Sequence, residues 1–156
     1  MGRPVRDPDV VVALRPLRAD ELPAFVERGR EEYRRQLIEF AGLDAEEAAA
    51  KAERDWALAG TPEQAIYEVE HEERAVGTLW FAEVRGRAYL YEIWVEPDER
   101  GRGFGRAAMA ALETEARRRG LRGVELNVWA GNAVARSLYR SLGYEEQAVF
   151  MTRDFD

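Results

Sequence analysis

Cysteine, histidine and lysine are almost missing from this chain of 156 residues, which has no cysteine, one histidine and one lysine. Without cysteine there is no disulfide, no thiol nucleophile and no thiolate ligand for a metal ion. The single histidine, His71, lies in the acidic stretch E-H-E-E-R and is expected to be a solvated turn residue. These absences disfavour a Ser–His–Asp triad and a multi-histidine metal site, so no metal is expected. The lack of cysteine also favours the cytoplasm.

Long apolar runs are missing too. No stretch of 18 apolar residues occurs, so no segment is expected to span a membrane. The start, M-G-R-P-V-R-D-P-D, lacks the apolar core of a secretory signal. The net charge of −7 argues against general nucleic-acid binding. Residues 1–100 hold 23 acidic and 14 basic side chains, whereas residues 101–156 hold 7 acidic and 9 basic ones. A cofactor that carries phosphates would therefore suit the second half.

The length suits one domain with its own core, covering residues 1–156, in which residues 1–9 are expected to be a flexible N-terminus. Hydrophobic periodicity and turn residues predict the elements. Strands are expected at 10–17, 64–70, 75–84, 87–95 and 124–129, with a last strand or hairpin after residue 144. Helices are expected to begin at the cap Asp20, at the capping-box-like pair Asp44 and Glu47, near Gly103, and after residue 132. Short links between the three central strands predict an antiparallel meander.

Residues along the strand 87–95 are expected to alternate between two faces. One face would carry Leu90, Glu92 and Trp94, and the other Tyr89, Tyr91, Ile93 and Val95.

The stretch from Val95 to Gly105, V-E-P-D-E-R-G-R-G-F-G, joins this strand to the next helix. Its three glycines let backbone N–H groups approach a ligand, and the helix start adds unpaired donors and a partial positive charge. The loop is therefore expected to hold a pyrophosphate-like anion, with a tight turn on a basic surface as the alternative. A Walker A loop is excluded because the only lysine is Lys51. A dinucleotide fingerprint is excluded because Arg106 stands where its last glycine would be.

Two motifs in the second half resemble those of the GNAT superfamily of N-acetyltransferases. The first is Arg100-Gly101-Arg102-Gly103-Phe104-Gly105 after a strand that ends Val95-Glu96-Pro97, and it is similar to the family's [RQ]-x-x-G-x-[GA] after V-x-P. The second, L-N-V-W-A-G-N-A-V-A-R-S-L-Y-R-S-L-G-Y, looks like the family's strand, Asn, helix, Tyr and L-G-[FY] ending. The resemblance covers about residues 75–146 and extends to the ribosomal-protein alanine acetyltransferases.

The resemblance implies an α/β (α+β) GNAT fold. Its central sheet would be mixed, mostly antiparallel and twisted, with six to seven strands flanked by about four helices. The fourth and fifth strands would splay apart in a V that holds acetyl-CoA. The cofactor-binding residues that the resemblance implies are the backbone of Ile93, Trp94 and Val95, then Arg100, Gly101, Arg102, Gly103, Gly105 and Arg106 around the pyrophosphate, and Asn132 and Tyr139 along the arm and near its sulfur.

The reaction that the resemblance implies is direct transfer, in which the primary amine of a small molecule or peptide attacks the thioester in a ternary complex. Tyr139 would protonate the leaving thiolate, since a phenol with a pKa of about 10 can donate to it. In the alanine acetyltransferases a glutamate is the base, but Asn127 stands at that position here and cannot accept the proton. Glu92 is therefore the expected base, acting through water, with Glu83 and Glu125 as weaker candidates.

Asn127 and Trp129 are expected to line the acceptor site. The expected partners are the amine substrate and a second copy in a homodimer, with no nucleic acid and no membrane. Two other functions stay open at this point. One is a non-catalytic acyl-CoA-binding or interaction module with the same fold, and the other is an enzyme that uses the glycine loop for ATP or NAD.

Overall fold

The computed structural model describes residues 10–156, so the expected flexible terminus at residues 1–9 lies outside the described part. The sheet consists of β1 (Ala13–Pro16), β2 (Gln64–His71), β3 (Arg74–Val84), β4 (Arg87–Val95) and β5 (Val124–Leu126). The helices are α1 (Leu22–Ala41), α2 (Ala45–Trp56), α3 (Phe104–Arg118) and α4 (Ala133–Ser141). Short 3-10 turns cover Ala19–Glu21, Ala57–Gly60 and Pro97–Glu99.

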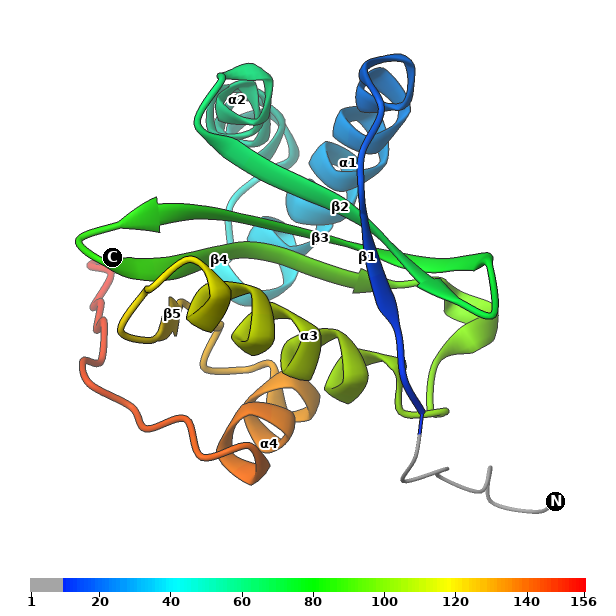
Figure 1. Cartoon of the computed structure of the whole chain (residues 1–156). Coiled ribbons are helices and arrows are strands. Elements are labelled where there is room, and N and C mark those ends of the chain that lie inside the picture. The colour runs from blue at the N-terminus through cyan, green and yellow to red at the C-terminus, as the bar shows by residue number, and fades with distance from the viewer. Residues whose placement is uncertain (1–9) are drawn as a thin grey trace, which may run out of the picture.

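The strands lie in the order of the sequence, β1-β2-β3-β4-β5. The first four form antiparallel pairs, which confirms the expected meander, and β5 pairs with β4 in parallel. The connection between β4 and β5 runs through α3, as a parallel pair requires. Figure 1 shows α1 and α2 over one face of the sheet and α3 and α4 over the other. The sheet is therefore mixed and mostly antiparallel.

The number of strands was overestimated. The described residues form five strands rather than six to seven, and residues 145–156 form neither the expected last strand nor a hairpin. This segment runs from α4 past the edge of the sheet that β5 forms (Figure 1). Val149, Phe150 and Met151 in this segment are all exposed. The segment is rich in residues that favour strands, but no neighbouring strand pairs with it here.

Three clusters of buried side chains among the described residues hold the layers together: one under the sheet, one over its other face, and a smaller one between α1 and α2. Under the sheet, Leu79, Phe81 and Leu90 pack on the buried face of α3, which includes Met109 and Leu112. Over the other face, aromatic side chains dominate, and Trp56 and Trp80 approach to 5.1 Å between ring centroids with Phe25 beside them. Aromatic contacts of this kind fix α1 and α2 on the sheet.

The starts of the first two helices differ in how they are capped. Asp44 caps α2 as expected, because its Oδ1 accepts a hydrogen bond from the Glu47 amide at 2.8 Å. Asp20 was wrongly expected to cap α1. Glu21 is the N-cap residue of α1, but its side chain does not cap that helix; its carboxylate accepts from the Arg18 amide before the preceding 3-10 turn at 2.9 Å and is held by Arg15.

A β-bulge interrupts the alternation in β4. Trp80 pairs with Glu92 but the next residue of β3, Phe81, pairs with Leu90, so Tyr91 has no partner. Beyond the bulge Ile93 joins Leu90 in the core under the sheet, which corrects the expectation that Leu90 and Glu92 share a face. The bulge instead turns Glu92 toward α1, where it contacts Arg28.

Candidate active site

The site is built where β4 and β5 part. β5 pairs only with Ala88–Leu90, while β4 continues to Val95 with no strand on that side among the described residues. This geometry agrees with the expected splay. It leaves the backbone groups of Ile93 at an open edge, where an extended ligand can pair as an added strand, whereas those of Trp94 face β3, as does the Glu96 amide that donates to the Val76 carbonyl.

The glycine loop follows directly. After the 3-10 turn Pro97–Glu99, Gly101 and Gly103 adopt φ values of 79° and 94°, which favour glycine. Gly103 is the N-cap of α3, so the first amides of this helix have no intrahelical acceptor. They point out of the helix start together with its partial positive charge, which suits an anion.

The arginines of this loop are held by the protein. Arg100 donates from Nε to the Val95 carbonyl at 2.9 Å, and Arg106 donates to the Ser141 hydroxyl at 2.7 Å. Arg102 pairs with Glu99, a buried carboxylate that also binds Arg74. The loop is thus braced by ion pairs on its inner side while Arg100, Arg102 and Arg106 keep the local charge positive.

The second motif lies on α4. Asn132 is the N-cap, and its Oδ1 accepts a hydrogen bond from the Ala135 amide at 3.2 Å, which leaves its Nδ2 as the free donor. Tyr139 packs against the core under the sheet, with its ring 5.8 Å from that of Tyr144. Burial raises the pKa of Tyr139 above its usual value, so the phenol keeps its proton at neutral pH.

Glu92 lies on the opposite face of the sheet from α3, and its side chain is only 12% exposed. Arg28 of α1 donates from Nη2 to Glu92 Oε1 at 2.6 Å and to the Thr78 hydroxyl at 2.9 Å. Thr78 donates to the same Oε1 at 3.2 Å. Burial raises the pKa of Glu92, and the bonds from Arg28 and Thr78 oppose that rise. Glu92, the residue expected to act as the base, is therefore largely buried and paired with an arginine.

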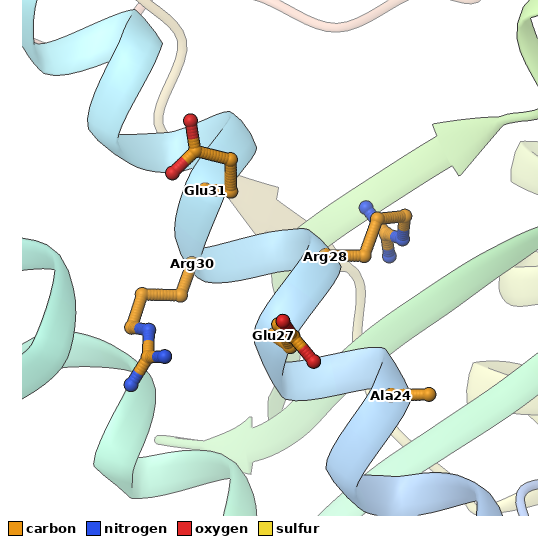
Figure 2. A pocket seen from close by; sticks show the side chains of 5 residues that line it. All are labelled: Ala24, Glu27, Arg28, Arg30 and Glu31. Atoms are coloured by element: carbon orange, nitrogen blue, oxygen red, sulfur yellow. The ribbon is translucent and has the colours of Figure 1, made fainter.

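Arg28 is the member of this group that the sequence did not indicate. It lies in a hollow on α1 lined by Ala24, Glu27, Arg28, Arg30 and Glu31. Figure 2 shows that Arg28 extends toward the strands, whereas Arg30 turns the other way. The Arg28 guanidinium lies 4.1 Å from the centroid of the Trp94 ring. In the sequence Arg28 is one of several arginines on a polar helix, and only the fold distinguishes it from the others.

The two expected acceptor-site residues are bound to other side chains. Asn127 donates from Nδ2 to the Tyr89 hydroxyl at 2.7 Å and is exposed. Trp129 stacks on Phe40 of α1 at 6.4 Å between centroids and packs against the core between α1 and α2. Trp129 therefore ties the segment after β5 to the helix layer.

The weaker base candidates are tied elsewhere. Glu83 pairs with Arg119 at 3.3 Å and Glu125 with Arg85 at 3.0 Å, both in exposed surface pairs. Such pairs are ordinary on a charged surface and indicate no site.

Comparison with protein families decides what this arrangement is. The model of the Acetyltransferase (GNAT) family matches residues 22–144, which include α1, the splay, the glycine loop and α4. The chain belongs to the GNAT acetyltransferase family. It is therefore an N-acetyltransferase, and its cofactor is acetyl-CoA, which GNAT acetyltransferases use, rather than ATP or NAD.

Several individual relatives agree with this assignment. An uncharacterized N-acetyltransferase, YycN of Bacillus subtilis, is 27% identical over 155 residues, which cover 92% of this chain and 99% of that protein. The crystal structure of YycN superposes with a TM-score of 0.86 at 25% identity, over 93% of this chain and 99% of that one. The GNAT protein fold thus extends over nearly the whole chain.

Two further matches are narrower in what they show. The ribosomal protein bS18 alanine N-acetyltransferase of Escherichia coli is 41% identical over 66 residues, or 42% of this chain and 45% of that protein. The PaiA N-acetyltransferase of Thermoplasma acidophilum, solved with coenzyme A, has a TM-score of 0.70 at 14% identity over 89% of this chain and 92% of that one, and shows the fold alone. Among the helices of residues 10–156, none combines the length and apolar character of a membrane span.

Proposed function

We propose that this GNAT enzyme acetylates a primary amine of a small molecule or peptide by direct attack in a ternary complex. The observation that carries the proposal is Glu92, a buried carboxylate beside the splay of β4 and β5 with one oxygen left without a hydrogen bond. Tyr139 supplies a protonated phenol from α4, on the other side of the sheet edge. Base and acid would thus approach the acetyl group from different elements.

The chemistry then follows from these two groups. Glu92 accepts the proton of the acceptor ammonium, directly or through water, and leaves a neutral amine. The amine nitrogen attacks the thioester carbonyl, the new C–N bond forms and the C–S bond breaks. Tyr139 gives its proton to the leaving thiolate, and the excess proton of the amide nitrogen passes to water. The products are the N-acetylated amine and free coenzyme A.

For the cofactor we propose the residues around the splay and the loop. Backbone groups of Ile93 would pair with the pantetheine arm, while those of Trp94, expected to do the same, face β3, and the first amides of α3 would hold the pyrophosphate. The Nδ2 of Asn132, which the helix cap leaves free, would bond the arm. Val95 contributes less than expected, because its carbonyl already accepts from Arg100.

Acceptor contacts are proposed for the surface between β5 and the helix layer, where Asn127 and Trp129 lie. A homodimer and a location in the cytoplasm stay predictions. The charge of this face, with Glu92 and Glu32 near Arg28, is consistent with a cationic amine.

Release of the coenzyme A thiol from acetyl-CoA, measured with a panel of amines and peptide N-termini, tests the proposal. Turnover is expected with at least one amine class and a loss of about 100-fold in kcat for Glu92→Gln. Glu83→Gln is the matched control, because Glu83 is paired at the surface with Arg119 and should leave kcat unchanged. Acetylation that is equally fast in Glu92→Gln would remove Glu92 as the base.

A further inference from the structure

The two oxygens of Glu92 have different surroundings. Oε1 accepts hydrogen bonds from Arg28 and from Thr78, at 2.6 Å and 3.2 Å. Oε2 accepts none from the described residues, and it is not among their fully buried atoms that lack a partner, so it keeps contact with solvent. One oxygen is therefore fixed and the other is available for a proton.

The position of Arg28 costs free energy, because one of its donors is buried without a partner. Within residues 10–156 its Nη1 is the only fully buried side-chain nitrogen or oxygen with no hydrogen-bond partner. The guanidinium lies 4.1 Å from the centroid of the Trp94 ring and 5.6 Å from that of the Phe25 ring, while the side chain as a whole is 24% exposed. A buried donor without a partner costs about 1–3 kcal/mol. If this ion pair served only to stabilise the fold, well-packed apolar residues at the same positions would often stabilise it more.

From this asymmetry we infer that Arg28 is a positioning residue: with Thr78 it anchors Oε1 of Glu92, keeps the carboxylate ionised, and leaves Oε2 to accept the proton of the acceptor amine. The inference rests on the proposed function, in which Glu92 is the base. It assigns to α1, which carries no family motif, a direct influence on the chemical step.

The charges around Glu92 set the sign of the expected effect. Burial raises the pKa of Glu92, Arg28 lowers it, and Glu32, also on α1, raises it again; β3 contributes only the neutral Thr78 hydroxyl. The base works when it is ionised, so activity is lost as pH falls through the pKa of Glu92. Removal of the Arg28 charge raises that pKa further, and the acidic limb of the pH profile moves to higher pH.

Arg28→Met, Arg28→Lys and Thr78→Val test the inference through kcat/KM against pH, on one acceptor amine. The titration of the amine is then the same in every variant, and only differences between variants are read. For Arg28→Met the acidic limb is expected to move up by about one pH unit or more. Arg28→Lys keeps the charge, so its acidic limb should lie close to that of the parent. Thr78→Val should move the limb to higher pH by less than Arg28→Met does.

Arg30→Met is the matched control, because Arg30 lies on the same helix and extends away from the strands (Figure 2). It removes the same charge and should leave the limb in place. An Arg28→Met protein that folds, binds coenzyme A normally and keeps the parent limb overturns the inference. If Arg28→Met does not fold, Thr78→Val decides: an unchanged limb in Thr78→Val overturns it as well.

A titration that needs no turnover separates this inference from the proposed function. In protein labelled with carboxyl-13C glutamate, the signal missing from Glu92→Gln identifies Glu92. Its midpoint is expected to rise in Arg28→Met and to stay unchanged in Arg30→Met. A raised midpoint together with full activity of Glu92→Gln would show that Arg28 controls the carboxylate but that the base has been assigned wrongly. An unchanged midpoint overturns the inference whatever the activity.

Discussion

The Nδ2 of Asn127 donates to the Tyr89 hydroxyl at 2.7 Å, across the parallel pair of β4 and β5. Tyr89 pairs with Glu125 in the register of these strands and lies one position before Leu90, the last paired residue, so the bond joins β4 close to the splay to the chain that leaves β5. Where the alanine acetyltransferases were expected to carry a glutamate base, this protein has an amide that links two strands. This hydrogen bond is enough to explain the presence of Asn127 without a role in catalysis.

Asn127→Ala should therefore have a small effect on the chemical step. Because Asn127 has no proton-accepting group, kcat is expected to stay within about threefold of the parent, well short of the 100-fold or more that loss of a general base brings. Steady-state kinetics with one acceptor amine, run beside Glu92→Gln, measures both. A loss in Asn127→Ala as large as that in Glu92→Gln would place Asn127 in the reaction instead.

Tyr139→Phe removes the proposed acid and nothing else that the fold needs. The hydroxyl makes no hydrogen bond within the described residues, while the ring packs against the core. The expected result is a fall of about 100-fold in kcat with the Kd for coenzyme A nearly unchanged. Tyr144→Phe is the control, because its hydroxyl bonds Glu113 at 3.2 Å and serves α3 rather than the site. Equal kcat in both variants would contradict the assignment.

The pH dependence on the basic side follows from the same residue. Burial raises the pKa of Tyr139 above the usual value near 10. The acid must be protonated to act, so kcat is expected to hold up to about pH 10 and to fall only above that value. A profile of kcat at saturating acceptor between pH 7 and pH 10.5 measures it, and a fall through Tyr139 below pH 9 would show that the phenol is more acidic than its burial implies.

Gly103→Ala tests the glycine loop. Gly103 has a φ of 94° at the N-cap of α3, so a side chain there is strained by roughly 1–2 kcal/mol and distorts the first amides of the helix. The loss of one charge-assisted bond to a phosphate costs about 1.5 kcal/mol, so the Kd for coenzyme A should rise about tenfold.

Gly120→Ala is the matched control for that variant. Gly120 follows the other end of α3 with a φ of 74°, and a Cβ there would meet no atom within 4 Å. The backbone strain is similar, but the anion site is remote. Calorimetry of coenzyme A binding and chemical unfolding of both proteins should show similar losses of stability and weaker binding in Gly103→Ala alone; weaker binding in both would mean that stability, not the loop, sets the affinity.

Gly29→Ala should disturb the packing of α1 against α2 and the sheet. A Cβ at Gly29 would overlap the Trp56 ring, which is itself packed against Phe25 and Trp80. Overpacking of this kind costs about 1–3 kcal/mol of unfolding free energy. Gly60→Ala, where a Cβ meets nothing within 4 Å, should stay within about 0.5 kcal/mol of the parent. Urea unfolding compares them, and equal midpoints would show that α1 can shift without loss.

Much of the frame could be predicted from local patterns. The bounds of β4 and the antiparallel meander agree with the sequence, because short polar turns and β-branched runs fix them locally. The glycine loop and the capped start of α4 followed from motifs whose residues have fixed places. Arg28 could not be found this way, because its role depends on a contact with Glu92, which is 64 positions away in the chain.

Two expectations failed for physical reasons that a single sequence does not display. Residues 145–156 have strand-like composition, but β propensity describes how a residue suits a sheet surface and supplies no neighbouring strand. The faces of β4 were assigned by simple alternation, which assumes that each residue has one partner. The unpaired Tyr91 breaks that assumption, and no glycine marks the position in the sequence.

Tyr91 has a practical effect on redesign of this enzyme. A library that varies every second residue outward from Leu90 would reach the hydrophobic core at Ala88 but the face that contacts Arg28 of α1 at Glu92 and Trp94. Deletion of Tyr91 would make the ladder regular, with Leu90, Glu92 and Ile93 following one another opposite Phe81, Trp80 and Leu79, and would leave Ile93 and Val95 in the core. The extra residue thus shifts the alternation, so that Leu90 and Ile93 both face the core while Glu92 and Trp94 face α1.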